Sequence, residues 1–103
     1  MYKPSKFLGP MIKEKRMTLE KLRAEILSID RELIRLIHKR MLVSIKIGKL
    51  KRKQGLSLRN YRQERLVLQS AKICGKMNKL STRFIASLMK RIIQESKKMQ
   101  SEL

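Results

Sequence analysis

An arginine interrupts an otherwise apolar helical stripe in the first half of the sequence. The stripe advances in alternating steps of three and four, as expected for a long helix that packs on other helices; its members are Leu19, Leu22, Ile26, Ile29, Leu33, Leu36, Val43, Ile47 and Leu50. The position that the pattern reserves for an apolar residue after Leu36 holds Arg40. A guanidinium there is costly unless an anion meets it. The alternative is that it reaches solvent or a carboxylate of the protein, of which there are only 8 for 27 Lys and Arg.

Other polar residues break apolar faces in the same way. Lys51 follows Arg40 by three helical turns and so lies on much the same face, although a charged run of this kind is more often solvated. Ser96 and Gln100 continue the apolar stripe of a C-terminal helix, where fraying is the alternative explanation. Glu64, one of the few acids, stands near the start of the helix between them. Together these groups predict a cation-rich pocket suited to a small dianion that carries a hydroxyl.

The sequence offers little for acid–base, nucleophilic or metal chemistry. It contains one His and one Cys, which excludes a disulfide framework and any zinc site built from Cys and His within one chain. We expect His38 to face away from Arg40 as a surface or packed histidine, and Cys74 to be a small apolar residue near a helix end.

Composition favours one all-α domain. The 103 residues include 42% hydrophobic and only 4% aromatic residues, with 4 Gly and 2 Pro, and helix-forming Leu, Ile, Met, Lys and Arg dominate. The net charge is +19, and most of it falls after the first 17 residues. Such a surface attracts nucleic acid, acidic membranes or small anions. No apolar run is long enough to span a membrane and no secretory signal precedes the helices, so we expect a cytoplasmic protein.

Start and stop signals divide the chain into an extension and three helices. Residues 1–17 hold both prolines and are expected to form a basic, flexible or loosely docked extension before a helical domain, 18–103. The first helix should run over about 18–53, between an N-cap at Thr18 and a stop at Gln54-Gly55. At about 50 Å it is long for a monomer of this size and needs a partner along its length.

Two further helices follow. The second should begin after an N-cap at Asn60 and end near Cys74, with Gly75 as its terminator. The third should follow a cap at Ser81. The predicted order is therefore long, short and medium.

Arg23 lies beside the same apolar stripe, seventeen residues before Arg40. On one straight helix that separation is about 25 Å, too far for both residues to hold one small ligand. If Arg23 contributes to the site, it must come from a second chain.

These residues resemble the all-helical chorismate mutases. The resemblance covers about residues 18–100. In the first helix it rests on Leu22-Arg23, Ile26, Ile29-Asp30, Leu33, Leu36-Ile37, Arg40, Gly48-Lys49 and Lys51, and in the third on Ile92-Ile93-Gln94-Glu95-Ser96 with Gln100. Short pieces of this pattern are weak signals, whereas the ordered set is specific. It implies an interlocked helical homodimer that rearranges chorismate to prephenate, for phenylalanine and tyrosine synthesis, without a cofactor.

The resemblance also implies roles for individual residues. Arg40 and Arg23 of the other subunit would hold the two substrate carboxylates, with help from Ser96. Lys51 and Gln100 would hydrogen-bond the ether oxygen, and Glu64 would accept the ring hydroxyl. The reaction is unimolecular, so the protein would supply only conformation and electrostatics.

Two positions depart from the family pattern, which usually reads Asp-x-x-Arg-Glu before and at the matched glutamate. Here Asn60 and Gln63 replace the Asp and the Arg. Asn60 can still hydrogen-bond the hydroxyl, but Gln63 lacks the expected cation. The site tolerates the change, or activity is weak, or the second helix starts elsewhere.

Two alternative functions remain open at this point. A related branch of the fold removes pyruvate from isochorismate, although the matched Glu64 and Gln100 favour the mutase. A basic helical protein that binds nucleic acid is the other. Its support is the charge of +19. Against it stand the small number of aromatic residues, four in all, and the lack of a recognisable motif, so we expect no nucleic-acid partner beyond nonspecific attraction.

Overall fold

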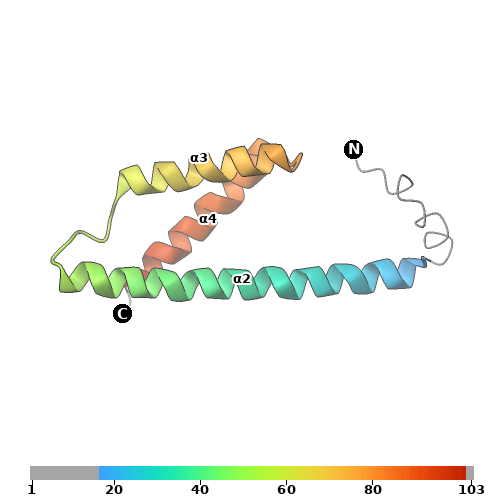
Figure 1. The fold of residues 1–103 in the computed structure, drawn as a ribbon, viewed down its shortest axis with the longest axis horizontal. Helices are drawn as coiled ribbons and strands as arrows, with labels where there is room; N and C mark the ends of the chain where they lie inside the picture. Colours follow the sequence, from blue (N-terminus) through green and yellow to red (C-terminus); the bar gives the residue numbers. More distant parts are fainter. Residues whose placement is uncertain (1–16, 102–103) are drawn as a thin grey trace. The chain divides into compact units, whose positions relative to one another are not determined.

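The computed structural model describes residues 17–101 of the chain, which form three α-helices. They are α2 (Leu19–Lys53), α3 (Tyr61–Met77) and α4 (Thr82–Ser101) (Figure 1). The predicted all-α class is confirmed. The middle helix has 17 residues and α4 has 20, so the order is long, medium and medium, and the prediction of a short second helix was wrong. The predicted extension, apart from Met17, lies outside the described residues.

The chain divides into two compact units after Ile37, within α2. In the first unit the described residues are the beginning of α2. The second unit, His38–Leu103, contains the rest of α2 with α3 and α4, and the candidate site lies wholly inside it.

The boundaries of α2 agree with the sequence signals. The hydroxyl of Thr18 accepts a hydrogen bond from the Lys21 amide at 3.1 Å, as an N-cap does. At the other end Gly55 has a φ of +70°. The Leu56 amide donates to the Lys51 carbonyl and the Gly55 amide to the Arg52 carbonyl, which together form a Schellman motif.

The end of α3 differs from the prediction that Gly75 terminates it. The helix continues to Met77, and the left-handed residue that ends it is Lys79, with a φ of +58°. The Leu80 amide bonds back to the Gly75 carbonyl across this turn. Gly75 is a packing residue instead: a Cβ added to it would lie 2.7 Å from a side-chain carbon of Ile85 in α4.

Helices of the second unit meet at small residues. The buried residues of the described chain are Ser44, Gly48, Gly75 and Ser96. Helix α4 packs on α3 near its own start, where Gly75 faces Ile85, and reaches α2 near its end, where Gly48 faces Gln100 (Figure 1). The missing side chains at these two glycines let the backbones approach closely, and this brings three helices to one place.

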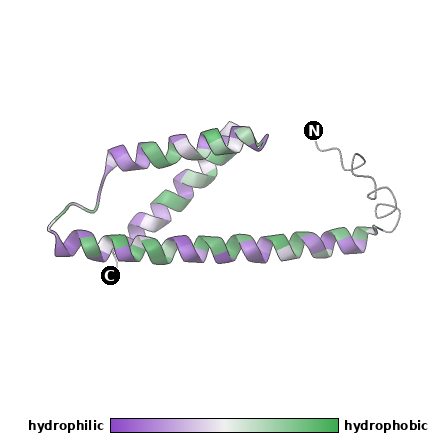
Figure 2. Cartoon of the chain, viewed as in Figure 1, coloured by the Kyte–Doolittle hydropathy of each residue, from purple (hydrophilic) through white to green (hydrophobic). Residues whose placement is uncertain are grey.

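The apolar stripe of α2 is uncovered in the single chain. Every one of its nine members is exposed, from 42% at Ile47 to 62% at Leu19, and no hydrophobic residue of the described region is buried. Figure 2 shows apolar residues recurring along the whole of α2. Exposure on this scale is unusual for a stable domain, because burial of such side chains supplies most of the free energy of folding.

None of the described helices combines the length and the apolar character that a membrane crossing requires.

The Lys79 turn gives a test of the helix boundary. Replacing Lys79 by Gly should raise the free energy of unfolding by about 0.5–1 kcal/mol, because the left-handed strain disappears while glycine's freedom in the unfolded chain offsets part of the gain. Urea unfolding at equal protein concentrations would measure it. The matched control, Lys76→Gly inside α3, should lower the same free energy by about 1 kcal/mol. A loss of stability in Lys79→Gly would contradict this boundary.

Candidate active site

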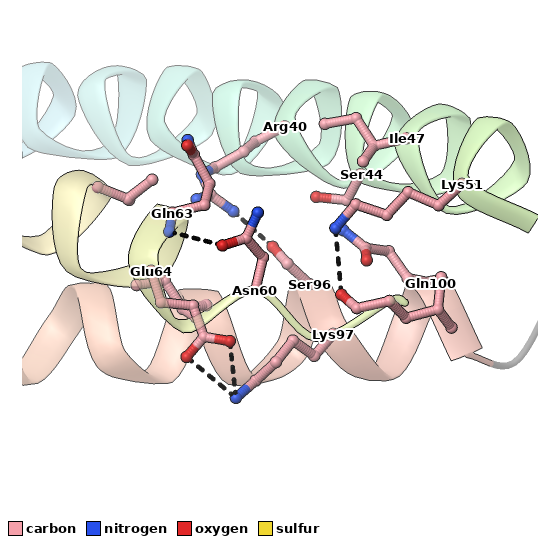
Figure 3. Close-up of a pocket in the computed structure, with 13 residues that line it drawn as sticks. Arg40, Ser44, Ile47, Lys51, Asn60, Gln63, Glu64, Ser96, Lys97 and Gln100 are labelled. Carbon is pink, nitrogen blue, oxygen red and sulfur yellow. Dashed lines mark hydrogen bonds and ion pairs between the residues drawn. The ribbon is translucent and has the colours of Figure 1, made fainter. Parts of the chain in front are cut away.

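Three helices and the loop after α2 surround a pocket of about 140 Å³ in the second unit (Figure 3). That is roughly ten times the volume that one water molecule needs. The residues that line it are Arg40, Ser44, Ile47, Lys51, Leu58, Asn60, Gln63, Glu64, Val67, Ile93, Ser96, Lys97 and Gln100. Seven of the eight residues predicted from the sequence are among them. Residues that lie up to sixty positions apart thus share one cavity.

Arg40 reaches into the pocket from α2 and donates a hydrogen bond to the hydroxyl of Ser96 on α4. Ser96 is 6% exposed, so this contact lies inside the helix crossing. The hydroxyl orients the guanidinium but carries no charge. Arg40 therefore keeps its positive charge available for an anion, and it makes no ion pair within 17–101.

Lys51 is oriented by a neutral group in the same way. Its ammonium donates to the Leu58 carbonyl at 3.1 Å, which leaves further N–H donors on the same nitrogen. Gln100 lines the pocket beside it (Figure 3). The side-chain oxygen of Gln100 is buried and has no hydrogen-bond partner among the described residues. An unpaired buried polar atom costs about 1–3 kcal/mol, and such atoms are found at functional sites.

Glu64 is the carboxylate of the pocket, and two cations hold it. The Lys97 ammonium lies 3.4 Å from both of its oxygens, and the Arg59 Nε lies 3.3 Å from Oε2. Arg59 also stacks on the Tyr61 ring, 4.2 Å from its centroid. Sequence reasoning did not identify Lys97 or Arg59. Lys97 is 33 positions from Glu64 and sits among other lysines, so no local pattern distinguishes it.

The two departures from the family pattern stand at the start of α3. The helix begins at Tyr61, as predicted, so a shifted start does not explain them. The Asn60 side-chain oxygen accepts from the Gln63 amide at 3.0 Å, and its NH₂ group remains as a donor. Gln63 lines the pocket with an uncharged side chain.

Arg23 belongs to the first unit, is exposed, and is not among the lining residues. In the region that the structure describes, no group of three or more His, Cys, Asp or Glu is arranged to hold a metal ion. The two residues noted for their chemistry, His38 and Cys74, are exposed and lie outside this pocket. Cys74 lies in the last turn of α3, near a helix end as predicted.

Comparison with known proteins shows the family to which the chain belongs. Residues 22–101 match the family described as chorismate mutase type II. The chain belongs to this family. The matched region includes all eight predicted site residues, all of α3 and α4, and α2 from residue 22 onward.

Two curated relatives show the same similarity. A bifunctional chorismate mutase/prephenate dehydratase of Buchnera aphidicola subsp. Schizaphis graminum is 33% identical over 81 residues, which is 79% of this chain and 21% of the relative. The T-protein of Haemophilus influenzae is 35% identical over 78 residues, or 76% of this chain and 21% of the relative. The chain therefore spans about a fifth of the length of these two proteins.

The crossing at Gly48 can be tested by a small substitution. A Cβ in Gly48→Ala would lie 3.0 Å from Gln100 Cβ and 3.1 Å from its Cα, so the end of α4 would have to move. We expect the free energy of unfolding to fall by about 1–2 kcal/mol, measured by urea unfolding. The neighbouring Lys49→Ala, on an exposed side chain, should change it by less than about 0.5 kcal/mol. Equal stability of the two variants would show that α4 does not approach α2 here.

Proposed function

We propose that the protein is a chorismate mutase, which converts chorismate to prephenate in the synthesis of phenylalanine and tyrosine. The observation that supports this most is the joint placement of Arg40, Lys51, Glu64, Ser96 and Gln100 around one pocket of a chain that belongs to the family. Chorismate is a dianion with a ring hydroxyl and an ether oxygen. The pocket offers Arg40 and Lys51, which make no ion pair among the described residues, beside the paired Glu64 and Lys97, so its charge is complementary to the substrate.

The proposed mechanism uses binding and electrostatics alone. Arg40, oriented by Ser96, would bind one substrate carboxylate through charge-assisted hydrogen bonds. Holding the enolpyruvyl side chain over the ring restricts the substrate to conformers close to the transition state. No proton transfer is needed, because one C–O bond breaks as one C–C bond forms within the same molecule.

Lys51 and Gln100 would stabilise the charge that develops during this step. As the C–O bond breaks, electron density grows on the ether oxygen. An ammonium that Leu58 already orients costs no reorganisation when this happens. The Gln100 amide would donate a second hydrogen bond to the same oxygen.

Glu64 would accept the hydrogen bond of the ring hydroxyl, with Asn60 beside it. The Asn60 oxygen is engaged in capping α3, so its contribution to substrate would be a donated N–H. Gln63 would replace the family's cation by a neutral amide. The loss of this positive charge would weaken binding of the substrate carboxylates, so we expect a higher KM for chorismate than with the arginine.

The uncovered stripe of α2 supports a homodimer in which Arg23 completes the other subunit's site. Between 19 and 37 the helix carries four acidic and four basic residues, so two copies of this segment could associate without net repulsion. The exposed Leu and Ile side chains there would gain burial from such a partner. The second carboxylate of chorismate would then be bound by Arg23 of the second subunit.

The role of Lys51 can be measured directly. In Lys51→Ala we expect kcat/KM for chorismate, followed by the loss of chorismate absorbance, to fall about 10²–10³-fold, because a preorganised donor to a developing oxyanion is removed. Lys53→Ala, two residues away on an exposed side chain, removes the same charge and should retain the activity of the parent protein. Similar losses in both variants would mean that Lys51 acts only through the overall positive charge of the protein and not through a contact with the ether oxygen. Release of pyruvate from isochorismate by the parent protein, with chorismate untouched, would assign the lyase reaction instead.

The shared site predicts complementation between inactive variants. Arg23→Ala and Arg40→Ala should each lose most activity. When equal amounts are unfolded together and refolded, half of the dimers are mixed, and each mixed dimer has one intact site. Activity should therefore return to about a quarter of that of the parent protein, by the same symmetry argument. No recovery, with dimers verified by sedimentation, would exclude a site shared between subunits.

A further inference from the structure

The Glu64 carboxylate shares its pocket with two cations that it does not pair with. Arg40 and Lys51 both line the cavity, yet both are bonded to neutral oxygens, and the ion pairs of Glu64 are with Lys97 and Arg59. Figure 3 shows the same division, with Glu64 turned toward Lys97 and with Arg40 and Lys51 on the α2 side.

Without Lys97 and Arg59, the Glu64 carboxylate could form ion pairs with other cations of the pocket. Opposite charges in a half-buried site attract more strongly than they do in water. A Glu64 released from its partners would therefore pair with Arg40 or Lys51. Such a pair would neutralise the cation that a substrate carboxylate needs, so the substrate would have to displace an internal competitor before binding.

Lys97 is in the best position to prevent this. Its ammonium contacts both oxygens of Glu64, whereas Arg59 contacts one. The Lys97 side chain is 31% exposed against 49% for Arg59, so solvent screens the Lys97 contact less. Lys97 also follows Ser96 directly, so neighbouring residues of α4 contact Arg40 and Glu64.

We propose that Lys97 is a positioning residue, which holds Glu64 against α4 and so keeps Arg40 and Lys51 free for the carboxylates and the ether oxygen of the substrate. This inference rests on the proposed mutase function and adds to it. It assigns to Lys97 a role in substrate affinity that acts entirely through Glu64.

The test is a double-mutant cycle between Lys97 and Glu64, with KM and kcat for chorismate measured separately. In Lys97→Met we expect KM to rise about fivefold with a smaller change in kcat, since one partly buried ion pair is lost while Arg59 remains. In the Glu64→Gln background the same Lys97 substitution should leave the KM of the Glu64→Gln protein unchanged, because a neutral side chain does not form an ion pair with Arg40 or Lys51. Lys97→Arg should restore most of the affinity.

Lys98→Met is the matched control. It removes one positive charge from the adjacent, exposed position, so it reports any loss of long-range attraction for the dianion. We expect its KM to match that of the parent protein, and equal circular dichroism of all variants excludes misfolding. An equal rise of KM in Lys97→Met and Lys98→Met, or the same Lys97 effect in both Glu64 backgrounds, would overturn the inference and leave the mutase function intact. A parent protein that does not convert chorismate would overturn both.

Discussion

In residues 38–103 eighteen Lys and Arg share three carboxylate side chains, Glu64, Glu95 and Glu102, so these cations far outnumber the acidic side chains of the same region. Burying a cation under that constraint requires neutral acceptors. The serine hydroxyl beside Arg40 and the loop carbonyl beside Lys51 serve this purpose. A neutral acceptor satisfies the hydrogen-bonding geometry without cancelling the charge, and the positive potential of the pocket follows from this arrangement.

The same pocket depends on close helix contact more than on a conventional core. Gly48 and Gly75 let α4 approach its two neighbours, and the residues buried in the described region are small. Large apolar side chains remain exposed along α2. The single chain therefore defines the geometry of one cavity. Its exposed apolar side chains do not contribute the free energy that their burial would supply. In the proposed homodimer, the second copy would supply that free energy and would bring its Arg23 to the site.

The substitutions at the start of α3 remove charges from the site and keep a capping side chain. Asn60 caps the helix at the position where the family usually has an aspartate, and both residue types are preferred N-caps. Gln63 brings an amide where the family usually has an arginine. The two changes exchange one carboxylate and one cation for neutral side chains, which leaves the net charge of the pocket the same.

Periodicity and capping residues were enough to predict three helices, both ends of α2 and the start of α3. These features are local, because hydrogen bonding and side-chain spacing within a few turns determine them. Polar breaks in the apolar stripes pointed to Arg40, Lys51, Ser96 and Gln100 with the nearby Glu64, whereas Asn60 and Gln63 were added by the resemblance to the family. Gly75 shows the limit: a glycine near a helix end can be a terminator or a close-packing residue, and only the position of Ile85 on another helix distinguishes the two. The pairing of Glu64 with Lys97 is also a tertiary fact. A chain with many lysines gives no sequence signal for the one that contacts a given carboxylate, since that choice depends on how α3 and α4 cross.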